Sequence, residues 1–62
     1  MTLILHGFDG RDVHIEPSAV VFISETHIGG RLCTRIELRS GDDVVVREPE
    51  SVLKAALTES ER

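Results

Sequence analysis

Three histidines and one cysteine are the side chains of this sequence that could bind a metal ion. His6 and His14 flank an Asp-Gly turn and would face each other across a hairpin, whereas His27 and Cys33 lie further along the chain. Structural zinc sites place cysteine and histidine at short, regular spacings such as Cys-x-x-Cys. The sequence has no such pair. We therefore expect surface histidines, with no metal and no other cofactor.

Catalytic chemistry has equally little support. A nucleophilic Cys33 would need a nearby base and a stabilised thiolate, and the sequence shows no cysteine–histidine signature. Asp42 and Asp43 could form an acid pair, but they follow Ser40-Gly41 in a turn pattern, where aspartate supports the backbone. We therefore expect no catalytic residues, and we expect that the protein is not an enzyme.

Arginines form the one local basic stripe in an acidic chain. Residues 31, 35 and 39 are spaced by four, which places them on one face of a strand, and a fourth arginine on the next strand could join them. Such a stripe could bind phosphate or an acidic partner. The alternative is a solvated face with cross-strand ion pairs of little energetic value. The candidate partner- or anion-binding residues are Arg31, Arg35, Arg39 and Arg47.

The elements that position these residues are short β-rich runs followed by one helical segment. We expect one domain over residues 1–62, with strands at about 2–6, 12–16, 20–27, 32–39 and 43–47 and a helix at about 49–58. The fold class is mainly β with one C-terminal helix (α+β). The strands would form a four- to five-stranded antiparallel meander, either as an open sheet beneath the helix or as a small SH3- or Sm-like barrel.

Local patterns support these elements. Asp9-Gly10 and Gly29-Gly30 predict two-residue hairpin turns. Residues 32, 34, 36 and 38 alternate with polar neighbours, as in a half-buried strand. Proline suits the first turn of a helix, so Pro49 marks the helix start. An apolar stripe at helical spacing then follows, formed by Val52, Leu53, Ala56 and Leu57.

Composition limits the classes of partner and compartment. A formal net charge of −4, with two phenylalanines and no Trp or Tyr, disfavours nucleic-acid binding. No apolar run approaches the ~20 residues of a membrane span, and no signal-peptide pattern is present. Because Cys33 is the sole cysteine, an internal disulfide is impossible. We therefore expect a cytoplasmic protein without membrane insertion.

The strands contain more apolar residues than one helix can cover. Runs at residues 3–5, 20–23 and 44–46 place apolar side chains on both faces of a sheet. Exposing them would create an aggregation-prone edge, so either the sheet closes on itself or another chain covers it. We expect a homo-oligomer, with a dimer favoured. The residues expected to mediate self-association are Val20, Phe22 and Val45.

The order of these patterns resembles that of the small FlbD/SwrD-type flagellar and swarming proteins. The corresponding segments are Leu5–Val13 around Asp9-Gly10, Ile15–Val20, Phe22–Glu25, Thr34–Gly41, Val44–Glu48 and the helix with Val52. The sequence departs from that family in having Asp9 where asparagine is favoured, and Gly29-Gly30 where a Pro-Asp-type turn is common. The resemblance implies a bacterial accessory protein that acts through contacts.

Two functions follow as expectations. The first is a non-enzymatic protein-interaction or accessory module of the FlbD/SwrD type, which associates with itself. The alternative is a small-barrel, Sm-like nucleic-acid-binding or regulatory protein that uses the arginine stripe.

Overall fold

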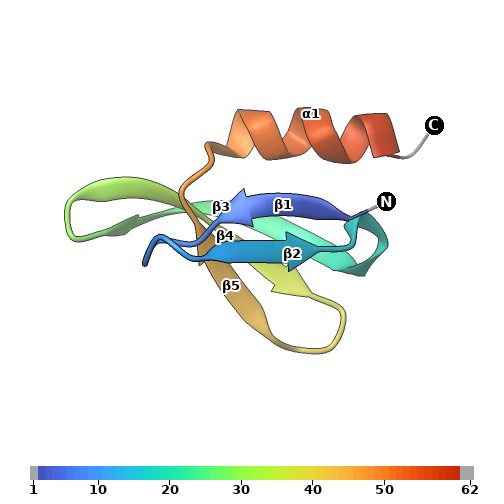
Figure 1. Ribbon diagram of the computed structural model, residues 1–62, viewed down its shortest axis with the longest axis horizontal. Helices are drawn as coiled ribbons and strands as arrows, with labels where there is room; N and C mark the ends of the chain where they lie inside the picture. The colour runs from blue at the N-terminus through green and yellow to red at the C-terminus, as the bar shows by residue number, and fades with distance from the viewer. Residues whose placement is uncertain (1, 61–62) are drawn as a thin grey trace.

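The computed structural model describes residues 2–60 of the chain. The expected domain of residues 1–62 also includes Met1, Glu61 and Arg62, which lie outside the described residues. The elements, in order, are β1 (Leu3–His6), β2 (Asp12–Ile15), the short 3₁₀ helix η1 (Pro17–Ala19), β3 (Val20–Ile28), β4 (Arg31–Leu38), β5 (Asp43–Val46) and α1 (Glu50–Ser60) (Figure 1). The predicted fold class, mainly β with one C-terminal helix, is confirmed.

The strands form two antiparallel sheets, a β1–β2 hairpin and a three-stranded sheet in the order β3-β4-β5. The sheets are joined where β1 ends. Gly7 forms a bridge with Val46, and the Arg47 N–H donates to the His6 carbonyl at 2.7 Å. Within residues 2–60 no ladder joins β2 to β3, which are connected through η1. The architecture therefore lies between the open sheet and the closed barrel.

The β1–β2 connection differs from the predicted two-residue turn at Asp9-Gly10. His6 pairs with Asp12, so the loop has five residues, 7–11, and only Gly10 within it has a positive φ, of 91°. The turn is closed within this loop, because the Gly7 N–H donates to the Arg11 carbonyl at 2.7 Å and the Gly10 N–H donates to the Gly7 carbonyl at 2.9 Å. Gly7 also forms the bridge with Val46. A Cβ at Gly7 would lie 2.9 Å from Asp9 Oδ1 and 3.2 Å from the Arg11 carbonyl oxygen, so a larger residue there would require both neighbours to shift.

One core is shared by both sheets and the helix. Its buried residues come from five elements, namely Leu5, Ile15, Ile36, Val46 and Leu53. Half-buried apolar side chains surround them, namely Leu3, Val13, Val20, Ile23, Leu38 and Val44. Most of the apolar runs therefore face inward, because the β1–β2 hairpin covers the sheet that one helix could not cover alone (Figure 1).

A β-bulge near the start of β3 decides which side chains of the run 20–23 are exposed. The register with β4 shifts between Val20 and Phe22. As a result Val20 and Ile23 both pack against the core, whereas Val21 and Phe22 are 58% and 57% exposed. Simple alternation would place Val20 and Phe22 on the same face, and the bulge separates them.

The helix presents a narrower apolar face than its sequence predicts. Leu53 is 1% exposed and lies in the core, but Val52 is 50% exposed and points away from it. Pro49 accepts the first helical hydrogen bonds through its carbonyl, at 3.0 Å from Val52 N and 3.2 Å from Leu53 N. Among residues 2–60, no helix is long and apolar enough to cross a membrane.

The alternation of β4 predicts opposite outcomes for two neighbouring residues. Ile36 is 1% exposed, so Ile36→Asp would bury an unpaired carboxylate and cost more than about 4 kcal/mol. A domain of this size has a free energy of unfolding on the order of 3–9 kcal/mol, so the variant should be unfolded. Glu37→Ala removes a surface ion pair worth about 0–1 kcal/mol. Circular-dichroism melts should separate them, and equal melting temperatures would contradict the strand register.

The contribution of the helix can be measured in the same way. Leu53→Ala should lower the free energy of unfolding by about 2–5 kcal/mol, because it leaves a cavity between the two sheets. Val52→Ala is the matched control and should change it by less than about 1 kcal/mol, since Val52 is half exposed and alanine favours helix. Urea titrations of both variants would provide the comparison, and similar losses would mean that α1 is wrongly oriented.

Candidate functional site

The polar centre nearest to the sheet junction is His6–Glu48. The Glu48 carboxylate accepts the His6 backbone N–H at 2.9 and 3.0 Å and lies 2.9 Å from His6 Nδ1. The Thr34 hydroxyl, which is fully buried, donates to the Glu48 carbonyl at 2.7 Å. These bonds tie β1 and β4 to the segment before α1. Nothing in the local sequence around Glu48 marks a partner 42 residues away.

The hydrogen bonds between His6 and Glu48 have a structural role. Burial disfavours ionised Glu48, but the hydrogen bonds from the His6 backbone and ring outweigh it and hold the pKa of Glu48 below its ordinary value of 4.5. The neighbouring hydroxyl of Thr34 is buried and already donates to a carbonyl, so it is not placed as a nucleophile. The carboxylate and imidazole therefore hold the junction together.

The metal-binding candidates are dispersed. His6, His14 and His27 are exposed and lie on three different strands. Cys33 is buried, with 4% of its surface exposed. Within residues 2–60, no group of three His, Cys, Asp or Glu side chains is arranged to hold a metal ion.

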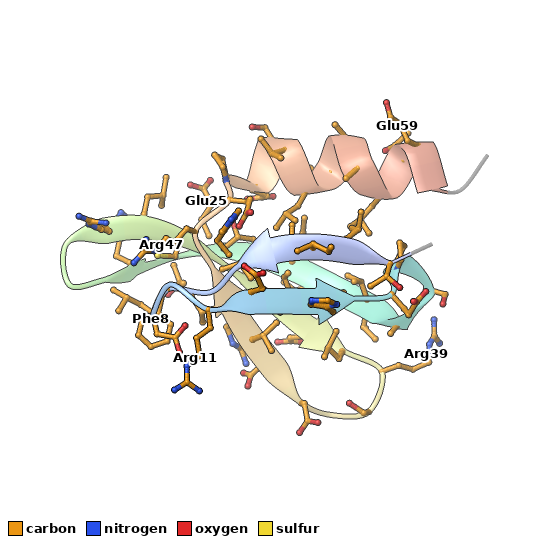
Figure 2. The ribbon with its side chains drawn as sticks, viewed as in Figure 1. Phe8, Arg11, Glu25, Arg39, Arg47 and Glu59 are labelled. Atoms are coloured by element: carbon orange, nitrogen blue, oxygen red, sulfur yellow. The ribbon has the colours of Figure 1, made fainter. Side chains whose placement is uncertain are left out.

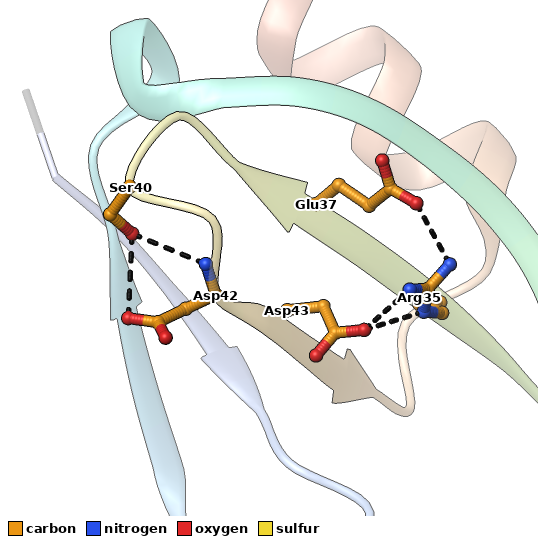
Figure 3. Close-up of polar contacts among 5 residues, drawn as sticks. All are labelled: Arg35, Glu37, Ser40, Asp42 and Asp43. Atoms are coloured by element: carbon orange, nitrogen blue, oxygen red, sulfur yellow. Dashed lines mark hydrogen bonds and ion pairs between the residues drawn. The ribbon is translucent and has the colours of Figure 1, made fainter.

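Arg35 is engaged by acidic neighbours on both sides. Its Nε donates to Asp43 Oδ2 at 2.8 Å, and its Nη1 donates to Glu37 Oε1 at 2.9 Å (Figure 3). The hydrogen bond and charge of Asp43 raise the pKa of the Arg35 guanidinium further above its already high value. Asp42, the other half of the candidate acid pair, lies with Ser40 in the turn. Neither aspartate therefore faces the other as an acid–base pair would.

The remaining three arginines lie at separate places. Arg39 follows β4 and its Nη2 donates to the Ser18 carbonyl at 3.3 Å, whereas Arg47 donates to the Phe8 carbonyl at 3.0 Å. Figure 2 shows these two side chains at opposite ends of the molecule. Arg31 is exposed at the start of β4, beside the Gly29-Gly30 turn. The four arginines thus do not form one continuous basic surface.

The three residues expected to mediate self-association have different environments. Phe22 is exposed on β3. Val45 is half-buried on β5, opposite Arg35. Val20 packs against the core, and Val21 takes its place on the exposed surface because of the bulge. The apolar surface on β3 therefore consists of Val21 and Phe22.

A groove of about 900 Å³ runs beside these two residues. It is lined by β3 from Val20 to Glu25, by Pro17 and Ser18 of η1, and by Arg39; the helix contributes Glu50, Lys54, Leu57 and Thr58. β3 is the terminal strand of its sheet, so alternate backbone N–H and C=O groups point away from β4 without a ladder partner. The groove therefore combines a free strand edge with exposed apolar side chains.

The charged side chains that line the groove are Glu25, Arg39, Glu50 and Lys54. Lys54 Nζ lies 2.8 Å from Glu50 Oε1, and this hydrogen bond and the charge of Glu50, with a smaller effect of Glu25, raise the pKa of Lys54. Glu25 lies beside the start of α1, and Arg39 lies on the opposite side of the molecule (Figure 2). The apolar part of the groove, Val21 and Phe22, thus lies between the acidic Glu25 and the basic Arg39.

Comparisons with known proteins do not add to this geometry. No family model matches the chain, and neither the curated proteins nor the solved structures include a match. Function is therefore inferred from the described residues themselves.

The His6–Glu48 interaction predicts how the stability of the protein depends on pH. Because the pKa of Glu48 is lowered in the folded protein, its stabilising effect is fully present above about pH 4.5 and is lost as the pH falls through the folded-state pKa. Glu48→Gln should lower the free energy of unfolding by about 1–3 kcal/mol at pH 7. The difference from the wild type should shrink at pH 3. Urea titrations at both pH values test this, and a difference that grows at pH 3 would reverse the sign assigned to Glu48.

Proposed function

We propose that the protein is a non-enzymatic interaction module that binds protein chains, including copies of itself, through the free edge of β3. The observation that carries this proposal is the pair Val21 and Phe22, both more than half exposed beside a groove on β3, the terminal strand of the three-stranded sheet. Exposed aromatic and aliphatic side chains next to a strand edge are what strand addition uses, with backbone bonds for affinity and side-chain contacts for specificity.

The free energy of burying apolar side chains favours a partner that covers Val21 and Phe22. Burying a Val or Phe side chain is worth about 1.5–3 kcal/mol, and an exposed apolar strand edge invites uncontrolled pairing. The two sheets and the helix already bury most of the other apolar residues of the strands. A partner at β3 would hide both side chains and satisfy the outward backbone groups together.

The cellular setting is proposed from the sequence. The FlbD/SwrD-like order of patterns favours a bacterial accessory protein that works through contacts. A single, buried, unpaired Cys33 suits a reducing cytoplasm. A homodimer is the favoured assembly, because two-fold pairing through β3 is closed and uses the β3 edge of both copies.

The nucleic-acid alternative has less support. Arg35 is occupied by Asp43 and Glu37, and Arg39 lies at the opposite end of the molecule from Arg47 (Figure 2). A phosphate backbone requires a continuous basic track. We therefore propose that the interaction lies at the β3 edge and not on a surface formed by all four arginines.

Site-specific photocrosslinking tests the proposal. Phe22 would be replaced with p-benzoylphenylalanine, and Ile4, which is 59% exposed on the other sheet, would be replaced in the same way as the control. Each protein would be irradiated pure at tens of micromolar and in bacterial extract, with adducts identified by mass spectrometry. Adducts from position 22 and few from position 4 are expected. Equal yields, or none from position 22 in either sample, would contradict the proposal.

A further inference from the structure

The charges that flank the apolar part of β3 constrain what can occupy the groove. Arg39 lies beside Ala19, because its N–H donates to the Ala19 carbonyl at 2.8 Å. Glu25 lies six residues further along, at about 20 Å for an extended chain. The two side chains are therefore too far apart to pair within one molecule, and both are exposed. Between them lie Val21 and Phe22.

A second copy of β3 matches this arrangement only when it runs antiparallel. A parallel copy would place Glu25 next to Glu25 and Arg39 next to Arg39, and like charges opposite each other destabilise a sheet. An antiparallel copy with Phe22 opposite Phe22 brings Glu25 of each molecule close to Ala19 of the other. Because Arg39 borders Ala19, the groove is self-complementary under two-fold symmetry.

We propose that two copies of this chain associate through antiparallel pairing of their β3 edges, with Phe22 near the two-fold axis and Glu25 of each copy paired with Arg39 of the other. This inference rests on the proposed function and names its partner. The two three-stranded sheets would become one six-stranded sheet, ordered β5-β4-β3-β3-β4-β5. The half-buried Leu57 on α1 would then cover the partner strand from the groove wall.

Charge reversal tests the pairing directly. Glu25→Arg and Arg39→Glu should each weaken the dimer by about tenfold or more, because each places like charges together twice in the symmetric interface. The double variant restores opposite charges, so its dissociation constant should return to within about threefold of the wild type. Sedimentation equilibrium measures all four proteins, and circular-dichroism melts verify that each is folded.

Two controls match the charge changes outside the groove. Arg31→Glu lies at the β3–β4 turn and Asp12→Arg lies on β2, and both positions are exposed. Neither should alter the dissociation constant by more than about twofold. A double variant as weak as the single variants, or single variants as tight as the wild type, would overturn the Glu25–Arg39 pairing.

A cysteine at the axis provides an independent measurement. Directly opposed residues of antiparallel strands have Cα atoms about 4.5–5.5 Å apart, which is within disulfide range. Phe22→Cys should therefore form a covalent dimer on mild oxidation, and Ile4→Cys should not. A wild type that is monomeric at high micromolar concentration would overturn the inference. Identified adducts with another protein at position 22 would in that case leave the proposed function standing.

Discussion

The junction between β1 and β5 is the contact on which the rest of the molecule depends. A two-stranded hairpin is at best marginally stable alone, and the three-stranded sheet needs a second layer to bury its apolar face. The Gly7–Val46 bridge and the His6–Glu48 hydrogen bonds set the two sheets against each other, so Leu5 and Ile15 meet Ile36 and Val46. The helix follows directly from this junction, which places Leu53 over the shared core.

Joining the sheets on one side determines what stays open on the other. β5 gains β1 as a neighbour through the Gly7–Val46 bridge, whereas β3 remains the terminal strand. The bulge then turns Val21 and Phe22 outward at this terminal strand. The same closure that buries most of the valines leaves Val21 and Phe22 exposed beside the groove, between the charges of Glu25 and Arg39.

Sequence patterns predict the elements well, because strand alternation and turn glycines act locally. Thr34 and Ile36 are buried as the period of two in β4 predicts, and Gly29-Gly30 forms the expected turn. Leu32 departs from the predicted alternation because it is 52% exposed, and Cys33 departs from it because it is 4% exposed. The bulge at Val21 adds a residue that breaks this period without a marker in the sequence. The His6–Glu48 tie and the groove join segments distant in sequence, so local patterns contain no sign of them. Val20 and Val21 are the same residue type, so their positions relative to the bulge decide which of them is exposed.

The β3–β4 hairpin also bears on how the chain folds. Its strands are the longest in the molecule and are joined by two glycines, so their ladder forms between residues close in sequence. The Gly7–Val46 bridge instead joins residues 39 positions apart (7 to 46). Closing a long loop costs entropy before its contacts repay it. We therefore expect the central hairpin to form first and the N-terminal hairpin to dock onto β5 later, when the native topology is completed.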